Sequence, residues 1–286
     1  MRRICVAIFI ANLCLQISCE RINTPRCGRA LPLSRIVNGQ TVSRTRMPWI
    51  VFLRVSFRRG SHVHNILACS GSIVSPSFVV SAAHCLTEPN DETAASSVMV
   101  YYNSTERKKG PKIQAKRFAR HPEFVLRVYA NDVAILQLEK PLNFDKFVSP
   151  VCLPKKPIST TGRPLLIAGW GFTKEGGPDS DTLRYILKKE LPYKQCKPLL
   201  HHEAQLTLNE TIVICATARS KDACTGDSGA PVTTWNKRGK FFQVGIVSFG
   251  YGCARPNDAS GYTRVATFVP WILSVKKRYE RDGHSK

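Results

Sequence analysis

The sequence lacks several features that mark common protein classes. Beyond its N-terminus it has no run of the roughly 18 apolar residues that a membrane-spanning helix needs. It has no C-x-x-C pair, which argues against zinc ribbons and thioredoxin-like redox sites. It has no internal repeat and no low-complexity tract, and 43% of its 286 residues are hydrophobic. The composition is therefore that of a globular protein and not of a disordered one.

Acidic residues are scarce: 20 Asp and Glu face 42 Lys and Arg, which gives a formal net charge of +22. Such a charge favours anionic partners. The basic side chains gather in two clusters, the first formed by Arg107, Lys108, Lys109, Lys112, Lys116 and Arg117, and the second by Lys276, Lys277, Arg278 and Arg281. Two interpretations stay open, a solvated basic face or a surface that binds sulfated polysaccharide or another acidic macromolecule.

The N-terminus has the pattern of a secretory signal peptide. A basic start is followed by an uncharged apolar run over residues 4–17, and we expect residues 1–19 to be the signal. The alternative, a membrane anchor, is disfavoured because the run is short for a span. Cys5, Cys14 and Cys19 lie in this segment, so eight of the 11 cysteines remain for four disulfides in an exported, extracellular protein.

Export would also make two N-x-[ST] sequons usable, so we expect N-glycosylation at Asn103 and Asn209.

Short apolar runs rich in β-branched residues, separated by turn residues, predict an all-β sandwich or barrel. The runs cover residues 49–55, 72–80, 98–102, 133–138, 165–170, 212–216, 232–235 and 242–249. A C-terminal helix is predicted because Phe268, Ile272, Val275 and Tyr279 recur with helical spacing, and Thr267 is the expected N-cap.

Three segments contain residues suited to nucleophilic catalysis. Residues 81–85 read S-A-A-H-C around His84, residues 130–136 read A-N-D-V-A-I-L around Asp132, and residues 222–231 read D-A-C-T-G-D-S-G-A-P around Ser228. Taken alone, a His beside a Cys is more often structural, and G-D-S-G is a plausible turn. Their order, His then Asp then Ser, matches one of the convergent Ser-His-Asp solutions.

These segments resemble those of the chymotrypsin-like or trypsin-like serine proteases, over about residues 27–279. The resemblance implies two antiparallel six-stranded β-barrels with a C-terminal α-helix, and the activity of a secreted endopeptidase. It assigns the nucleophile to Ser228, the general base to His84 and the orienting carboxylate to Asp132. It also implies that Ser248 hydrogen-bonds Asp132, and that backbone N–H groups of Gly226 and Ser228 form the oxyanion hole.

The same resemblance implies activation by cleavage. The segment R-I-V-N-G resembles the family's activation junction, so a cut after Arg35 by another trypsin-like protease would free the amino group of Ile36. That group would then pair with Asp227, beside the nucleophile. We therefore expect a zymogen with a pro-segment over residues 20–35 and a protease domain over residues 36–286.

The cysteine pairings are also expectations from the resemblance. The implied disulfides are Cys69–Cys85, Cys224–Cys253, Cys196–Cys215 and the pro-segment tether Cys27–Cys152. A further common family bridge falls on Leu165 and Thr234, so both of its cysteines are absent together.

Specificity is expected to depend on the pocket for the substrate side chain. In the family, the position of Asp222 is the pocket floor, and an aspartate there selects Arg or Lys. Ala223 lacks a hydroxyl that could help a Lys ammonium, which favours Arg. Gly250 leaves one wall open, whereas Ser260 replaces the usual glycine and should narrow the pocket. Ala230 also replaces a usual glycine, and we expect it to be tolerated.

We expect no cofactor and no metal. Where calcium-binding relatives carry acidic ligands only Glu106 is present, and the two histidine pairs lack a third ligand. The expected partners are proteins or peptides with Arg or Lys, the activating protease, protease inhibitors and sulfated glycans, with no nucleic acid and no membrane span. The alternative is a basic glycan-binding or regulatory protein of the same fold with weak or vestigial catalysis.

Overall fold

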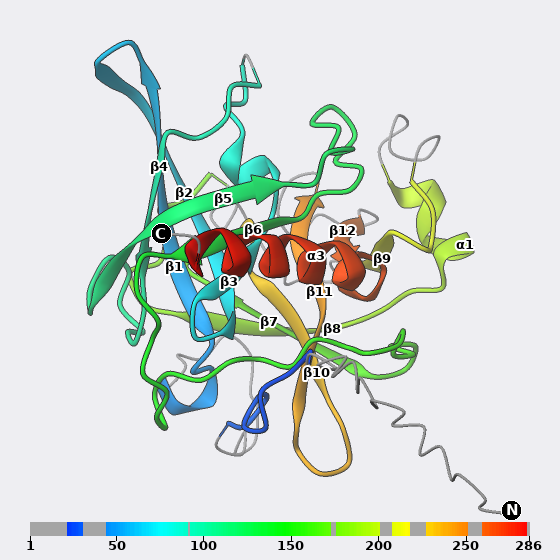
Figure 1. Ribbon diagram of the computed structural model, residues 1–286. Helices are drawn as coiled ribbons and strands as arrows, with labels where there is room; N and C mark the ends of the chain where they lie inside the picture. The colour runs from blue at the N-terminus through cyan, green and yellow to red at the C-terminus, as the bar shows by residue number, and fades with distance from the viewer. Residues whose placement is uncertain are drawn as a thin grey trace, which may run out of the picture.

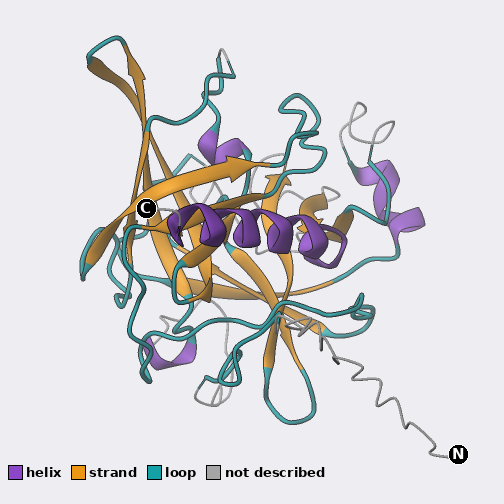
Figure 2. Cartoon of the chain, in the orientation of Figure 1, coloured by secondary structure: helices purple, strands orange, loops and turns teal. Residues whose placement is uncertain are grey.

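Antiparallel β-strands form most of the structure (Figures 1 and 2), a computed structural model. It describes residues 22–30, 44–90, 92–172, 176–200, 208–217, 227–250 and 259–284. Within these ranges twelve strands form two six-stranded units, with few and short helices apart from one at the C-terminal end.

The first unit is a closed barrel with the strand order β1-β2-β3-β6-β5-β4. Its strands are β1 (Ile50–Arg59), β2 (His62–Ser75), β3 (Phe78–Ser81), β4 (Ser97–Tyr101), β5 (Lys112–Arg120) and β6 (Ala134–Leu138). Opposed residues point into its core: Val80 pairs with Ile135, and all of their side-chain surface is buried. Each such aliphatic side chain contributes about 1.5–3 kcal/mol to the free energy of unfolding.

The second unit is a six-stranded sheet with the order β8-β7-β10-β11-β12-β9. Its strands are β7 (Pro164–Gly169), β8 (Arg184–Lys189), β9 (Val213–Thr217), β10 (Pro231–Trp235), β11 (Phe241–Gly250) and β12 (Ala259–Arg264). Its edges meet at an isolated bridge between Glu190 and Ala216, so the sheet forms a half-barrel. The predicted all-β fold with two six-stranded barrels is confirmed.

The helix α3 (Val265–His284) lies against β6 and β11, and it crosses in front of the strands in Figure 1. The predicted apolar face is confirmed, because Phe268, Ile272 and Val275 are all buried. The predicted start is wrong: an N-cap at Thr267 would place the first helical residue at position 268, whereas the helix begins three residues earlier, at Val265. The Thr267 hydroxyl donates to the carbonyl of Thr211 in place of capping. No helix within the described ranges is long and apolar enough to cross a membrane.

Shorter helical segments join the strands. They are η1 (Arg44–Arg46), η2 (His84–Leu86), α1 (Tyr193–Cys196) and η3 (Lys197–Leu199). Of these, η2 matters most for the site because it carries a predicted catalytic histidine.

Residues 22–30 are fixed to the body by more than one kind of bond. The disulfide Cys27–Cys152 is present, and the Asn23 side-chain amide donates to the Leu153 carbonyl and accepts from the Leu153 N–H, both at 2.8 Å. The expected pairs Cys69–Cys85 and Cys196–Cys215 are also present. The fourth expected pair, Cys224–Cys253, lies outside the described residues.

Candidate active site

Two predicted residues of the first barrel lie in direct contact. Ser81, at the end of β3, pairs with Ala134 at the start of β6, and this pairing brings His84 next to Asp132. The backbone N–H of His84 donates to one carboxylate oxygen of Asp132 at 2.9 Å, and His84 Nδ1 lies 2.7 Å from the other. Because an ionised carboxylate only accepts, Nδ1 carries the proton and Nε2 is left as an acceptor.

The half-barrel also holds Asp132, whose side chain is fully buried. Ser248, on β11, donates its hydroxyl to Asp132 Oδ2, and Thr263, on β12, donates to the Asp132 carbonyl at 2.7 Å. A buried charge is tolerated only when it is well hydrogen-bonded. The Asp132 carboxylate has three such partners: the backbone N–H of His84, His84 Nδ1 and the Ser248 hydroxyl. The contact between Ser248 and Asp132 that the resemblance implied is therefore present in the structure.

The predicted nucleophile lies on the loop before β10. The carbonyl of Ser228 accepts from the backbone N–H of Ser70 on β2 at 2.7 Å. Gly229 follows with a positive φ of 78°, and a Cβ there would lie 2.3 Å from Ser81 Oγ and 2.4 Å from the Ser70 carbonyl oxygen. Only glycine fits this position without a shift, so the nucleophile's loop packs closely against β2 and β3.

No hydrogen bond joins Ser228 to His84 among the described residues. His84 Nε2 lies 3.9 Å from the sulfur of Cys85. Catalytic hydrogen bonds are often long in the absence of substrate, so the lack of a bond between Ser228 and His84 is compatible with their roles as a nucleophile and its base. Cys69, His84 and Cys85 also lie close enough to resemble a metal site, but both sulfurs are bonded in a disulfide and cannot act as thiolate ligands.

Asp227 turns its carboxylate towards the end of β7. The backbone N–H of Gly171 donates to Asp227 Oδ1 at 2.9 Å. A Cβ on Gly169 would lie 2.1 Å from that oxygen, and a Cβ on Gly171 would lie 2.6 Å from the carboxylate carbon. Two glycines therefore provide the space in which this carboxylate lies.

Two aromatic residues near His84, the predicted base, were missed in the sequence. The Tyr129 ring packs edge-on against His84, with ring centroids 5.4 Å apart, and stacks on Phe249 at 5.8 Å. Burial, and then the charge of Asp132, raise the pKa of the Tyr129 hydroxyl, so the ring stays neutral. Sequence position could have indicated them, because Tyr129 lies three residues before Asp132 and Phe249 directly follows Ser248.

Some of the remaining predicted site residues lie in the described part of the chain and others do not. Ser260, on β12, is buried and pairs with Gly250 across the β11–β12 ladder. Ala230 is fully buried directly after the nucleophile's loop. The other predicted site residues lie outside the described part of the chain: Arg35, Ile36, Asp222, Ala223 and Gly226.

Comparisons with known proteins agree with this geometry. The sequence model of the trypsin family matches residues 36–272. The chain is 32% identical over 250 residues to serine proteinase stubble of Drosophila melanogaster, and 31% identical over 256 residues to the suppressor of tumorigenicity 14 protein homolog of Bos taurus. These alignments cover 85% and 86% of the chain, but only 31% and 29% of those longer proteins.

A solved structure titled as HL collagenase shares the fold, with a TM-score of 0.71 at 23% sequence identity. The match covers 85% of the chain and 99% of that structure. Since the family match spans most of the chain, and the fold and the contact between His84 and Asp132 agree with it, the chain belongs to the trypsin family of serine proteases.

Proposed function

We propose that the protein is a secreted serine endopeptidase that cleaves peptide bonds after Arg, and less well after Lys. The observation that carries the proposal is the Asp132 carboxylate, which is buried and binds His84 at two points. A histidine fixed in this tautomer presents a free Nε2, which is what a base for a serine hydroxyl requires.

The reaction divides the hydrolysis into two steps. Ser228 Oγ attacks the carbonyl carbon of the substrate while its proton passes to His84 Nε2, and that proton then leaves with the departing amine. The acyl group stays on Ser228 as an ester until water, deprotonated by His84, attacks it and releases the acid. Asp132 stabilises the imidazolium that exists between the transfers.

We assign the oxyanion hole to the backbone N–H groups of Gly226 and Ser228. The Ser70 and Gly229 contacts support a rigid Ser228 backbone, which a preorganised donor needs. Loss of one such donor in comparable enzymes costs about 3–4 kcal/mol of transition-state stabilisation.

We assign the charge preference to Asp222, whose carboxylate would select a cationic side chain. Ala223 offers no hydroxyl to a Lys ammonium, whereas an Arg fork pairs bidentately without one. The buried position of Ser260, opposite Gly250, supports a pocket that is narrowed by one hydroxymethyl group. The stacked Tyr129 further limits the space beside His84 for a neighbouring substrate side chain.

The test is a comparison of kcat/KM for matched Arg, Lys and Phe peptide amides, on chain that has been cleaved after Arg35. We expect Arg to exceed Lys, and both to exceed Phe. Ser228→Ala should abolish labelling by a fluorophosphonate, whereas Ser96→Ala, which alters a hydroxyl bonded to the Ser56 carbonyl, should not. A preference for Phe would rule out Asp222 as the pocket floor, and labelling that survives in Ser228→Ala would rule out the nucleophile.

We further propose that the protein is made as a zymogen, with residues 1–19 as the signal, 20–35 as the pro-segment and 36–286 as the protease domain. The glycine-lined position of the Asp227 carboxylate supports its pairing with the new Ile36 ammonium. The Asn23 and Cys27 bonds would keep the cut segment attached. Treatment of Arg35→Gln with trypsin tests this, because activity without a new Ile36 terminus would contradict it.

We also propose one additional partner class, sulfated glycans, on the basis of the two basic clusters. The two basic clusters meet at Arg117, on β5, which bonds Asp282 on α3 at 2.9 Å and lies over the Tyr279 ring. Some of the basic groups are already ion-paired, including Lys109 with Glu106.

A heparin column tests the glycan proposal. We expect Lys108→Gln and Lys112→Gln, each tested alone, to lower the salt concentration needed for elution more than the matched Lys109→Gln, because the Lys109 charge already has a partner. Elution of all variants at the same salt concentration would show that the clusters are a solvated basic face and do not bind the glycan.

A further inference from the structure

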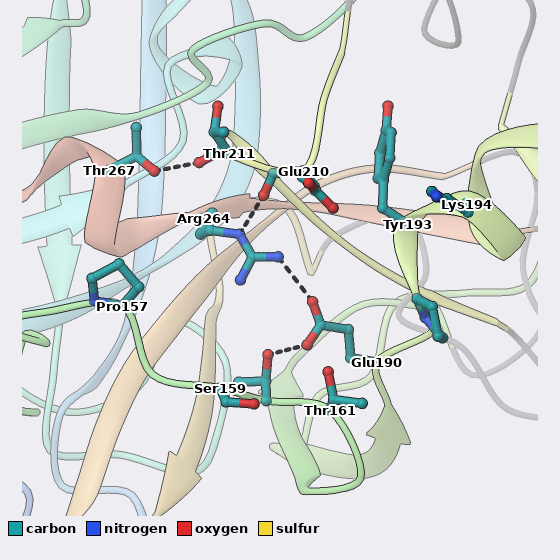
Figure 3. Close-up of a pocket in the computed structure, with 12 residues that line it drawn as sticks. Pro157, Ser159, Thr161, Glu190, Tyr193, Lys194, Glu210, Thr211, Arg264 and Thr267 are labelled. Carbon is teal, nitrogen blue, oxygen red and sulfur yellow. Dashed lines mark hydrogen bonds and ion pairs between the residues drawn. The ribbon is translucent and has the colours of Figure 1, made fainter.

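A cavity of about 590 Å³ lies apart from the candidate active site and shares no lining residue with it (Figure 3). It is formed by the loop of residues 157–161, the connection 190–192 between β8 and α1 with the start of α1 itself, the turn 210–211 before β9, and the β12–α3 junction at 264–267. Glu190, which lines the cavity, also forms the bridge at which the two edges of the half-barrel meet.

The floor of this cavity is an ion pair that is already satisfied. Arg264 Nη2 lies 2.8 Å from Glu190 Oε1, and both side chains are mostly buried. The other Glu190 oxygen accepts from the Thr160 hydroxyl, while Arg264 Nε donates to the Glu210 carbonyl at 2.8 Å. Because the two charges neutralise each other and have further partners, the floor is preformed and has no free charge to attract an ion.

The rest of the lining is rich in hydroxyl groups and neutral overall. The charges of Arg264 and Lys194 balance those of Glu190 and Glu210 in a chain whose net charge is +22. Burial, and then the charge of Glu210, raise the pKa of the Tyr193 phenol, which stays protonated and donates to the Leu208 carbonyl. The hydroxyls come from Ser159, Thr160, Thr161, Tyr193, Thr211 and Thr267. Such a surface suits a neutral polyhydroxylated ligand, because its balanced charges give no net attraction for a sulfate or phosphate.

The sequon Asn209-Glu210-Thr211 lies at the rim, since its second and third residues line the cavity. The Asn209 side chain is exposed, and its Oδ1 accepts from the backbone N–H of Thr211 at 2.9 Å and from the Thr211 hydroxyl. Its Nδ2 donates no hydrogen bond within the described ranges. The amide is therefore oriented through its oxygen, and its nitrogen is open to modification.

The other sequon differs. Asn103 is half-buried and has a left-handed φ of 55°, in a turn that the hydrogen bond from Tyr102 N–H to the Pro111 carbonyl closes. Its Oδ1 is buried without a hydrogen-bond partner. The two sequons, which are equivalent in sequence, therefore differ in access.

We propose that Asn209 carries an N-linked glycan and that the first sugars of this glycan lie in the cavity. Asn209 Nδ2 would displace the diphosphate of a lipid-linked oligosaccharide at the anomeric carbon, losing one proton as the new C–N bond forms. The inference rests on the export that the proposed function includes. The bound sugars would cover the edge of the half-barrel at Glu190.

The first experiment measures occupancy. The full chain is expressed in secretory eukaryotic cells with its own N-terminus and, in parallel, with a standard leader in place of residues 1–19, which separates a failure of export from a failure of glycosylation. We expect peptide-N-glycosidase to lower the mass of the secreted chain, and Asn209→Gln and Thr211→Val to remove the glycan at residue 209. The matched Thr211→Ser and Asn103→Gln variants should keep it. A secreted chain with no sugar on Asn209 overturns the proposal.

The second experiment measures docking. If the docked glycan is favoured about ten to one, only the undocked fraction is open to the glycosidase, and filling the cavity should speed native release about tenfold. Ser159→Trp, or independently Thr161→Trp, supplies the bulk, and Ser159→Ala is the control that should release at the wild-type rate. Equal rates in the wild type and both Trp variants would show that the glycan does not occupy the cavity.

Discussion

Replacement of Gly169 by Ala tests the activation mechanism through the Asp227 carboxylate, and it leaves Arg35, Ile36 and Ser228 themselves unchanged. The added methyl group would lie 2.1 Å from Asp227 Oδ1 and 3.0 Å from the carboxylate carbon, far inside normal contact distance. The obstacle lies at the end of β7, so we expect the Asp227 carboxylate to move. It would then leave its bond to the Gly171 N–H and its proposed place beside the Ile36 ammonium.

The magnitude follows from the cost of leaving a buried charge unpaired, roughly 3–5 kcal/mol. At about 1.36 kcal/mol for each factor of ten, amidase activity should fall by roughly two to three and a half orders of magnitude. The cut after Arg35 should proceed at the normal rate, because the methyl group changes the response to cleavage and not the cleavage itself.

The assay follows the new Ile36 terminus by N-terminal sequencing and activity by hydrolysis of an Arg-amide on the same samples. Gly283→Ala is the matched control, since a Cβ at Gly283 has no atom within 4 Å. If cleaved Gly169→Ala retains wild-type activity, Asp227 does not need this position, and the proposed pairing with Ile36 is wrong.

Three further changes test other parts of the site and fold. Ser248→Ala removes one of the hydrogen bonds to the buried Asp132 carboxylate; a charge-assisted bond contributes about 1.5–3 kcal/mol, so kcat should fall roughly 10- to 100-fold with little change in KM, and an unchanged kcat would show that the hydroxyl does not position the pair. Ser260→Gly should raise kcat/KM for both Arg and Lys amides, by about 1–2 kcal/mol in transition-state stabilisation, and a decrease would contradict a narrowed pocket. Burial lowers the pKa of His121 below its ordinary value of 6.5, so the unfolded chain binds a proton that the folded chain resists; stability is complete above pH 6.5 and is lost as the pH falls below it. Urea unfolding at pH 7.5 and 5.5 should therefore show less dependence on pH in His121→Gln than in the wild type, and equal dependence would rule out this histidine as the cause.

The sequence predicted the strands whose side chains are apolar and missed those stabilised mainly by their neighbours. β5 (Lys112–Arg120) has four basic residues and one buried side chain, so its register with β4 and β6 defines it as a strand. β12 (Ala259–Arg264) is short and rich in small residues, yet most of it is buried because it lies between β9 and β11. Neither property is visible in a hydrophobic pattern.

The site could be predicted to the extent that it depends on local motifs. The residues of the S-A-A-H-C and N-D-V-A segments lie together as expected, because β3 and β6 pair beside them. The contact of Tyr129 with Phe249 could not be predicted, since it joins residues 120 positions apart through a left-handed φ of 55° at Tyr129. The wrong helix cap has a similar cause, because the Thr267 hydroxyl is used by the distant carbonyl of Thr211.

β8 is an edge strand of the half-barrel, because the two edges of the sheet meet only at the isolated bridge between Glu190 and Ala216, and this position has a consequence for solubility. An exposed edge strand presents unpaired backbone groups to other molecules and is a common starting point for aggregation, which proteins oppose with charged side chains at the edge. β8 carries Arg184, Lys188 and Lys189, and Lys188 is buried. A strand of a second molecule that paired here would have to approach the exposed, positively charged side chains of Arg184 and Lys189. The basic residues that hide β8 from a hydrophobic pattern thus also protect the folded molecule from self-association at this edge.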